Sequence, residues 1–204
     1  MYADTRAETG LRAMSPAVRA AMGKVERHRL VAPTQASAAY RNHPLPIGAG
    51  QTISQPYIVA LSTDLLQIDS NSVVLEVGTG SGYQAAVLAE IASRVYSIEI
   101  IDPLGKAAAK RLEELGYRNI EVRIGDGYKG WPEKAPFDAV VVTAAAPQVP
   151  PALVAQLKPG GRMVIPVGSG FDIQYLMLIT KRADGGYDER RVLPVRFVPL
   201  VPGK

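Results

Sequence analysis

The stretch that decides the fold is Val73-Val-Leu-Glu-Val-Gly-Thr-Gly-Ser-Gly82, in which an apolar run ends in three alternating glycines. A β-branched run bounded by glycine predicts a buried strand. The glycines allow the backbone to turn sharply and to approach a ligand closely. Residues 83–92 have helical composition. A strand, a glycine turn and a helix in this order are typical of the entrance to a nucleotide-type pocket at the carboxyl end of a parallel strand.

Strand and helix patterns alternate from residue 72 onward, which predicts an α/β fold with a doubly wound, mostly parallel sheet. We expect strands near 73–77, 94–99, 119–124, 137–142 and 161–166, and helices near 82–92, 103–115 and 149–157. Lys158-Pro-Gly-Gly161 should stop the last helix and turn the chain. Two further strands, near 172–180 and 190–199, flank a hairpin turn at Asp184-Gly-Gly186 and predict an antiparallel C-terminal edge.

Residues 1–45 are interpreted as a helical N-terminal appendage and loop, and 46–204 as the main domain of a single compact unit. Ser15 and Pro16 suit an N-cap and a first helical position, with the helix over residues 17–25. The proline- and glycine-containing segment 32–50 predicts a long loop, and long loops in compact domains are usually functional. Ser54 is predicted to cap a helix that covers residues 57–66.

The composition limits the classes of function. A length of 204 residues with 47% hydrophobic content fits one domain with its own core. Zero cysteines exclude disulfides and thiol catalysis, and two histidines leave little for a metal site, so we expect no metal. No apolar run is long enough for a membrane span or a signal peptide, which predicts a soluble cytoplasmic protein. The net charge of +4 is spread out and indicates a solvated surface rather than nucleic-acid binding.

The glycine turn departs from the dinucleotide-binding pattern. That pattern places its third glycine one position later, where this chain has Tyr83. Glu76 also precedes the first glycine by two positions, where a carboxylate would repel a phosphate and could bind an ammonium group. The turn, with Gly78 and Gly80, therefore favours a cationic ligand.

Three acidic residues follow successive predicted strands. Glu76 and Glu99 lie at the ends of the first two strands, and Asp126 with Gly127 follows the third. Glu99 is suited to the hydroxyls of an adenosine ribose, and Asp126 to an exocyclic amine such as that of adenine. Each acid alone is more often a strand end or a helix cap. Because the carboxyl ends of parallel strands converge on one crevice, the three together predict an S-adenosylmethionine site.

From about Tyr40 to Leu200 the chain resembles the protein-L-isoaspartate O-methyltransferases. The resemblance rests on Leu45-Pro-Ile-Gly-Ala-Gly-Gln-Thr-Ile-Ser-Gln-Pro-Tyr-Ile-Val-Ala60, a stretch similar to the signature of that family alone. Further matches are Gly125-Asp-Gly127, Phe137-Asp-Ala to Thr143-Ala-Ala-Ala-Pro147, Leu157-Lys-Pro-Gly-Gly161 to Ile165-Pro-Val-Gly168, and Phe197-Val-Pro-Leu200. It implies a Rossmann-like class I methyltransferase fold for the domain over 46–204.

The resemblance also implies roles for particular residues. Ser54 would be the active-site serine, and Gln51, Thr52 and Ile53 would help to enclose the cofactor. The segments 143–147 and 197–200 would flank the peptide substrate. Within these segments the substrate-contacting residues are predicted to be Thr143, Ala144 and Val198, together with Ser54.

The implied reaction is methyl transfer from S-adenosylmethionine to the α-carboxylate of L-isoaspartyl residues, which begins the repair of damaged proteins. The partners would be isoaspartyl peptides and proteins, and we expect a monomer. A carboxyl group with a pKa of about 3.5 is ionised at neutral pH, so no general base is required. Since no base is evident beside Ser54, we expect its hydroxyl to orient the carboxylate or the loop rather than to act as a nucleophile.

The chain departs from the family pattern at its front. Glu26 precedes Arg27 where the family usually has proline, and Leu30 stands where an aromatic residue is common. Residues 1–39 therefore match only loosely. This departure bears on how the segment covers the site, and less on the reaction.

Two alternatives remain open from the sequence. The basic surface and the atypical N-terminus would also suit a non-catalytic adenosyl-ligand binder or an RNA-associated module. Nicotinamide-dependent oxidoreduction is the other alternative, and Tyr83 and Glu76 disfavour it.

Overall fold

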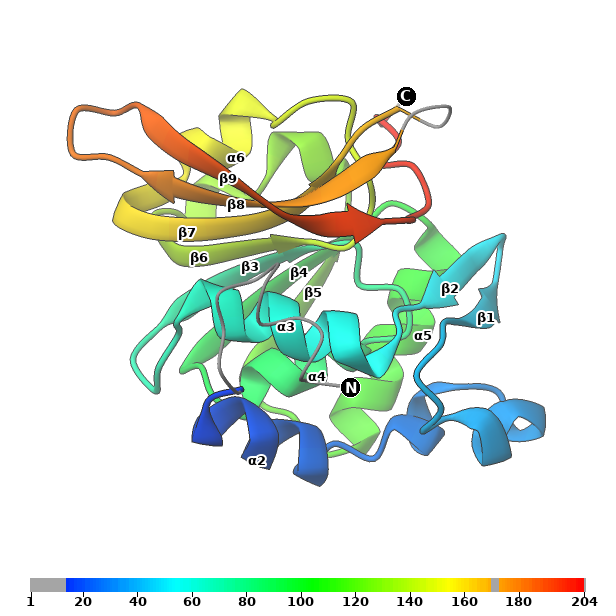
Figure 1. Cartoon of the computed structure of the whole chain (residues 1–204). Coiled ribbons are helices and arrows are strands. Elements are labelled where there is room, and N and C mark those ends of the chain that lie inside the picture. The colour runs from blue at the N-terminus through cyan, green and yellow to red at the C-terminus, as the bar shows by residue number, and fades with distance from the viewer. Residues whose placement is uncertain (1–13, 170–172, 204) are drawn as a thin grey trace.

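A seven-stranded sheet with the order β5-β4-β3-β6-β7-β8-β9 forms the centre of the molecule (Figure 1). The computed structural model describes residues 14–169 and 173–203. The strands are β3 (Val73–Val77), β4 (Arg94–Glu99), β5 (Ile120–Ile124), β6 (Phe137–Val142), β7 (Leu157–Val167), β8 (Gln174–Lys181) and β9 (Tyr187–Val195). Strands β5 to β7 of this order run parallel, and β8 is antiparallel to both of its neighbours. The predicted mostly parallel sheet with an antiparallel C-terminal edge is confirmed.

Helices cover both faces of the sheet, as expected for a doubly wound fold (Figure 1). Alternate residues of β3 enter two separate apolar clusters, with Val74 in one and Leu75 in the other. The first cluster lies under α2, α3, α4 and α5, and the second under α6. The helices are α2 (Pro16–Lys24), α3 (Pro56–Leu66), α4 (Tyr83–Ala89), α5 (Asp102–Glu114) and α6 (Pro151–Ala155).

The N-terminal helix predicted from Ser15 and Pro16 is confirmed as α2. The Ser15 hydroxyl oxygen accepts a hydrogen bond from the Val18 amide at 3.3 Å, and Pro16 is the first helical residue. Val18 and Ala21 belong to the same apolar cluster as α3 and α4. Residues 14–45 therefore pack into the core of the sheet domain.

The segment predicted as a long loop contains regular structure. A short antiparallel pair forms from β1 (Leu45–Gly48) and β2 (Gln51–Ile53), and two 3₁₀ turns precede it at Arg27–Leu30 and Pro33–Ala38. The sequence pattern did not predict the β1–β2 pair because Pro46 and Gly48 normally weaken strands. Both residues are tolerated here because each strand of a two-stranded sheet is an edge strand.

The prediction that Ser54 caps α3 is wrong. The N-cap residue is Gln55, whose side chain makes no capping hydrogen bond. The Tyr57 amide in the first turn instead donates to the Asn42 side-chain oxygen at 3.0 Å. A side chain from a distant segment has taken over the capping role. The Ser54 hydroxyl makes no hydrogen bond within residues 14–169 and 173–203, so it is available to a ligand.

The seventh strand of the chain, β7, begins four residues before the predicted start. Phe137 pairs with Leu157 and Ala139 pairs with Arg162, so Lys158–Gly161 form a bulge within the strand. Gly160 adopts a φ of +79°, which allows this bulge. The glycines at 160 and 161 therefore correctly predicted a local turn, but this turn is a bulge inside β7 rather than the connection before it.

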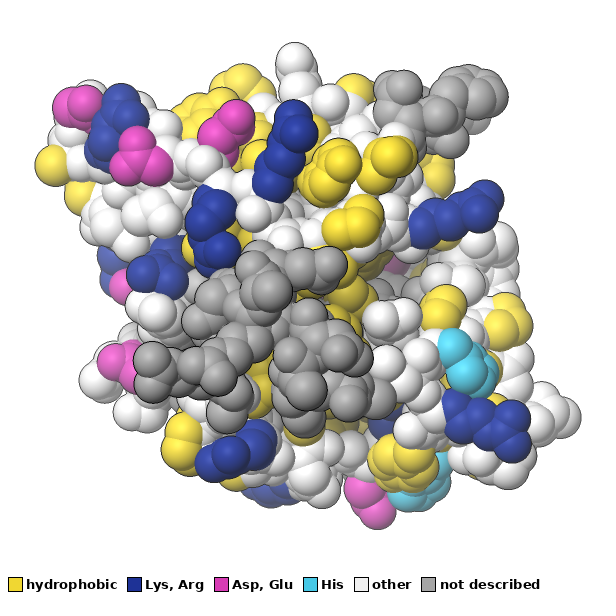
Figure 2. All heavy atoms as spheres, viewed as in Figure 1, with side chains coloured by type: hydrophobic (Ala, Val, Ile, Leu, Met, Phe, Trp, Pro, Cys, Tyr) yellow, Lys and Arg dark blue, Asp and Glu magenta, His cyan; other side chains and the backbone are white. Residues whose placement is uncertain are grey.

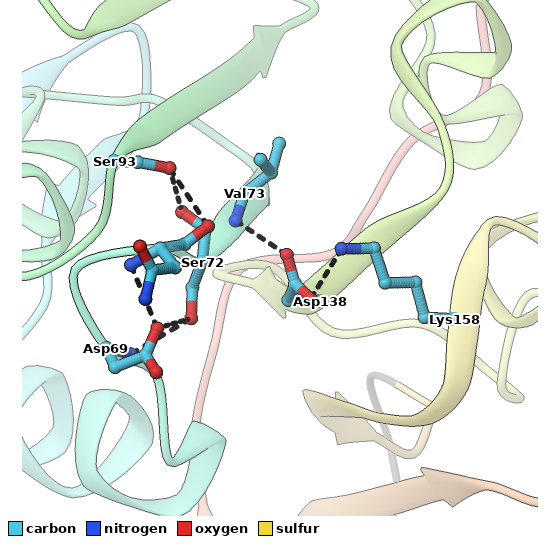
Figure 3. Close-up of polar contacts among 7 residues, drawn as sticks. Asp69, Ser72, Val73, Ser93, Asp138 and Lys158 are labelled. Carbon is cyan, nitrogen blue, oxygen red and sulfur yellow. Dashed lines mark hydrogen bonds and ion pairs between the residues drawn. The ribbon is translucent and has the colours of Figure 1, made fainter.

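A polar network joins the amino ends of the central strands (Figure 3). These ends are opposite to the carboxyl ends, where the glycine turn lies. Asp138 accepts a hydrogen bond from the Val73 amide at 2.8 Å and pairs with Lys158 at 2.7 Å. The Ser93 hydroxyl donates to the Ser72 carbonyl at 2.8 Å. These contacts fix the starts of β3, β4, β6 and β7 relative to one another. The carboxyl ends of the same strands are thereby set in register for a common site.

Candidate functional site

The order of the strands reverses at β3, and a cavity opens at this point. From β3 the chain adds β4 and β5 on one side, and β6 and β7 on the other. In open parallel sheets, ligands bind at the carboxyl ends of the strands where the order reverses. The lining comes from the turn after β3, the end of β4, the β2 segment, the end of β6 and residues 198–201.

Most of the residues predicted from the sequence meet in this cavity. Its lining includes the following predicted residues: Gln51, Thr52, Ile53, Ser54, Gly78, Gly80, Glu99, Gly127, Thr143, Ala144 and Val198. They come from segments far apart in the chain, so their convergence is a property of the fold. Glu76 and Asp126 were predicted with them and do not line the cavity.

The turn after β3 and the end of β6 are in direct contact. The Thr143 hydroxyl donates a hydrogen bond to the Gly78 carbonyl at 2.6 Å, and the Thr143 amide donates to the Val77 carbonyl at 2.9 Å. Gly78 adopts a φ of +99°, and a Cβ atom there would lie 2.3 Å from the Thr143 hydroxyl oxygen. Glycine is favoured here because any other residue would be strained at this φ and would displace the Thr143 hydroxyl.

Glu99 is held in place by backbone amides. Its carboxylate accepts hydrogen bonds from the amides of Gly80 at 2.8 Å and Ile101 at 2.9 Å, one on each oxygen. The side chain is buried yet lines the cavity. Because a carboxylate oxygen can accept more than one hydrogen bond, both oxygens retain capacity for a ligand. The two Glu99 oxygens could therefore each accept a hydrogen bond from one of two neighbouring hydroxyl groups on a ligand.

Glu76 lies below the glycine turn, where its side chain is fully buried. The Ser97 hydroxyl donates to its carboxyl group, and the Ser97 and Thr79 hydroxyls are hydrogen-bonded to each other. Burial, reinforced by the charge of Glu99, raises the pKa of Glu76 to about 8, although the Ser97 hydrogen bond opposes this shift. The expectation of an ionised carboxylate facing the cavity is therefore corrected for Glu76. Because burial raises its pKa, the Glu76 carboxyl group is mostly protonated at neutral pH. Its side chain lies in the core and does not line the cavity.

Asp126 caps the short turn at Gly127–Lys129. Its carboxylate accepts a hydrogen bond from the Tyr128 amide at 2.9 Å. A Cβ atom on Gly203 would lie 3.0 Å from the Asp126 Cβ, so the C-terminal segment passes close beside it. The Asp126 side chain is thus engaged in local structure, while its neighbour Gly127 reaches the cavity.

Arg27 is a residue whose importance the sequence did not reveal. Its guanidinium is completely buried and donates to the carbonyls of Ala39 and Ser54, each at 2.8 Å. It also lies over the ring of Tyr83 at 5.1 Å, a cation–π contact. Tyr83 lines the cavity, and burial raises its pKa to about 12. Arg27 therefore ties the N-terminal segment to Ser54 and to the wall of the cavity.

Polar residues of the glycine turn also line the cavity and were not predicted as site residues. They are Thr79 and Ser81, with Gln84 in the first turn of α4. Their positions between and shortly after the glycines were the available signal, because a turn that brings its glycine backbone close to a ligand also brings the neighbouring residues close to it.

A second, open groove adjoins the cavity and has a volume of about 540 Å³. Four residues line both hollows: Thr52, Ser54, Thr143 and Val198. Ser54 therefore lies at the junction between them. A group bound in the cavity and a chain bound in the groove would meet beside its hydroxyl.

Within residues 14–169 and 173–203, no helix is long and apolar enough to cross a membrane. The same residues contain no cluster of three or more histidine, aspartate and glutamate side chains that could hold a metal ion.

Comparison with known sequences gives consistent matches over nearly the whole chain. The profile of the protein-L-isoaspartate(D-aspartate) O-methyltransferase family matches residues 6–204. A protein-L-isoaspartate O-methyltransferase 2 from Polaromonas sp. is 61% identical over 197 residues, which cover 97% of this chain and 93% of the relative. A protein-L-isoaspartate O-methyltransferase 1 from Nitrosospira multiformis is also 61% identical, over 100% of this chain and 86% of the relative.

Solved structures give the same result. A protein-L-isoaspartate O-methyltransferase structure superposes with a TM-score of 0.84 at 30% identity, covering 91% of this chain and 61% of the other. A protein from Plasmodium falciparum, assigned to the same enzymes and solved with S-adenosyl-L-homocysteine, gives a TM-score of 0.79 at 26% identity. That match covers 93% of this chain and 92% of the other.

Arg27→Met should loosen the Ser54 segment. Methionine keeps the length of the side chain but leaves the Ala39 and Ser54 carbonyls without their donor, which should lower the free energy of unfolding by about 1–3 kcal/mol. Hydrogen exchange of the amides in residues 51–55 should accelerate. The matched control is Arg29→Met, because Arg29 is exposed and pairs with Glu26 on the surface. Equal exchange in both variants would show that Arg27 does not hold this segment.

Glu76→Gln should change the pH dependence of stability. With an ordinary pKa of 4.5 in the unfolded chain and about 8 in the folded protein, Glu76 keeps its proton in the folded state after the unfolded state has lost it. Wild-type stability should therefore fall between about pH 5 and pH 8 through this group. Glutamine does not titrate, so the variant should gain stability relative to wild type across that range. Thermal unfolding at several pH values tests this, with the exposed Glu113→Gln as control, and a pH-independent difference would contradict it.

Proposed function

Because the chain belongs to the protein-L-isoaspartate O-methyltransferase family, we propose how its own residues carry out methylation of L-isoaspartyl residues with S-adenosylmethionine. In this proposal the cavity binds the methyl donor, the adjoining groove binds the damaged peptide, and Ser54 orients the acceptor carboxylate. The observation that supports it most is the position of Ser54 at the junction of cavity and groove.

The cavity residues suit S-adenosylmethionine. When bound, this cofactor supplies an electrophilic methyl group on a positively charged sulfur. Glu99, with both oxygens able to accept further hydrogen bonds, would hold the ribose hydroxyls. The backbone of Gly78 and Gly80 would approach the ligand closely, and Gln51, Thr52 and Ile53 would enclose it from the β2 side.

Glu76, Asp126 and Gly127 have less direct roles in this proposal. Glu76 would support the glycine turn through Ser97 and Thr79, and its buried charge would be stabilised only when a cation lies close above the turn. Asp126 would hold the turn that presents the Gly127 backbone to the adenine end of the cavity.

The chain's own residues supply position rather than acid–base chemistry. The acceptor carboxylate is ionised at neutral pH, so it needs no general base. Ser54 would donate a hydrogen bond to one carboxylate oxygen and leave the other free to attack. Thr143, Ala144 and Val198 would confine the peptide beside it and exclude water. Alignment of the reacting groups can contribute about 7–11 kcal/mol at best.

We propose further that the enzyme acts as a cytoplasmic monomer on peptides and not on nucleic acid. Local neutralisation of the basic residues supports this view. Arg182 pairs with Asp184 and Asp188, and Arg94 pairs with Glu121. Nucleic-acid binders instead gather unpaired basic side chains on one face.

An assay with paired peptides tests the proposed function. An isoaspartyl peptide should accept labelled methyl groups from S-adenosylmethionine, and its aspartyl twin should not. Ser54→Ala should lower kcat by about 100-fold, the scale expected when a reacting group is misplaced by about 1 Å. The affinity for S-adenosyl-L-homocysteine should change little.

Ser93→Ala is the matched control, because the Ser93 hydroxyl belongs to the polar network at the amino ends of the strands, away from the cavity (Figure 3). Equal labelling of both peptides, or none, would overturn the proposed function. Unchanged turnover in Ser54→Ala would remove the serine from the mechanism and leave the cofactor site intact.

A further inference from the structure

The groove beside Ser54 carries a positive charge, that of Arg196. Among residues 14–169 and 173–203, its lining is mostly apolar and contains no acidic residue, and Arg196 is the one charged member. The groove is lined by the end of β9 and residues 196–198 on one side, and by Pro44, residues 52–55 and Ile58 on the other. A chain bound there would therefore pass an arginine with no counter-charge in the groove.

The other arginines near β9 are engaged elsewhere. Arg182 pairs with two aspartates of the hairpin, and the Arg191 guanidinium lies over the ring of Tyr175 at 5.0 Å. Arg190 also has an interaction partner. Arg196 is exposed, and within the described residues its guanidinium makes no hydrogen bond or ion pair. The unpartnered arginine is thus the one that faces the groove.

The charges along β9 are divided between its two ends. Figure 2 shows acidic side chains, with a basic side chain among them, toward the hairpin on the left of the view, whereas basic and hydrophobic side chains lie toward the carboxyl end of the strand. Asp184 and Asp188 neutralise Arg182 at the hairpin. Arg190 and Arg191 lie within β9 and outside the groove, whereas Arg196 follows the strand and lines the groove.

We propose that Arg196 makes the enzyme select isoaspartyl peptides that carry an acidic residue close to the isoaspartate. This inference rests on the proposed function, because it takes the groove as the peptide site. A volume of about 540 Å³ accommodates several residues of an extended chain, so a flanking side chain can reach the guanidinium. A carboxylate is the partner that a guanidinium binds best, through two parallel hydrogen bonds.

The expected size of the effect follows from the exposure of Arg196. An ion pair at a solvent-exposed site changes an equilibrium by roughly 1.5- to 5-fold, and the preference should weaken as salt screens the charges. Arg196 thus sets a modest preference between substrates and leaves the methylation step to the residues around Ser54.

Three isoaspartyl peptides that differ only in their flanking residues test this inference. The flanks are glutamate, glutamine or lysine on both sides of the isoaspartate, and kcat/KM is measured for each peptide. Wild type should prefer the glutamate peptide over the lysine peptide by about fivefold or more, since attraction and repulsion combine. Arg196→Gln should reduce this ratio to near one, and Arg196→Glu should invert it.

Arg191→Gln is the matched control, because it removes the same charge from β9 outside the groove. It should retain the wild-type ratio. A wild-type ratio near one, a preference for lysine, or equal loss of the preference in Arg191→Gln and Arg196→Gln would overturn the inference. The glutamine-flanked peptide separates a failure of the charge preference from a failure of the proposed function. If every variant methylates this peptide, the proposed function stands whatever the charge preference is. If wild type does not methylate it, the proposed function is refuted.

Discussion

The hydrogen bond from the Thr143 hydroxyl to the Gly78 carbonyl, at 2.6 Å, is the contact on which the site depends. It joins the ends of β3 and β6, the two neighbouring strands between which the order of the sheet reverses. A side chain larger than hydrogen at Gly78 would collide with the same hydroxyl. The cavity therefore exists because the glycine turn can lie directly against the next strand, and its wall is shared by the donor site and the groove.

Ser54 reaches the junction of cavity and groove through contacts that are distant in sequence. Arg27 donates to the Ser54 carbonyl, and Asn42 occupies the capping role at the start of α3. The serine hydroxyl is thereby released from local structure. The segment that precedes the sheet domain thus helps to shape the cavity, since it fixes the backbone of Ser54 where the cavity meets the groove.

Local patterns predicted much of the fold. The strands β3 and β6 follow from their apolar runs. In the cavity lining, Gly78, Gly80, Glu99 and Gly127 follow from glycines and an acid at strand ends, whereas residues 51–54, 143–144 and 198 were expected from the family resemblance. The roles of Glu76 and Arg27 could not be predicted in this way. Whether Glu76 faces the cavity or the core depends on the packing of Ser97 beneath the turn. The importance of Arg27 depends on three partners brought together only by folding.

Calorimetric titration with S-adenosyl-L-homocysteine tests whether the close approach of Gly78 to Thr143 shapes the proposed donor site. Gly78→Ala should weaken binding by about tenfold or more, because the free variant would move the turn to relieve a strain of about 1–3 kcal/mol, and ligand binding would have to restore that strain. Gly125→Ala is the control, since its Cβ would meet no atom closer than 3.7 Å, and it should bind within about twofold of wild type. Wild-type affinity in a folded Gly78→Ala protein would contradict the claim.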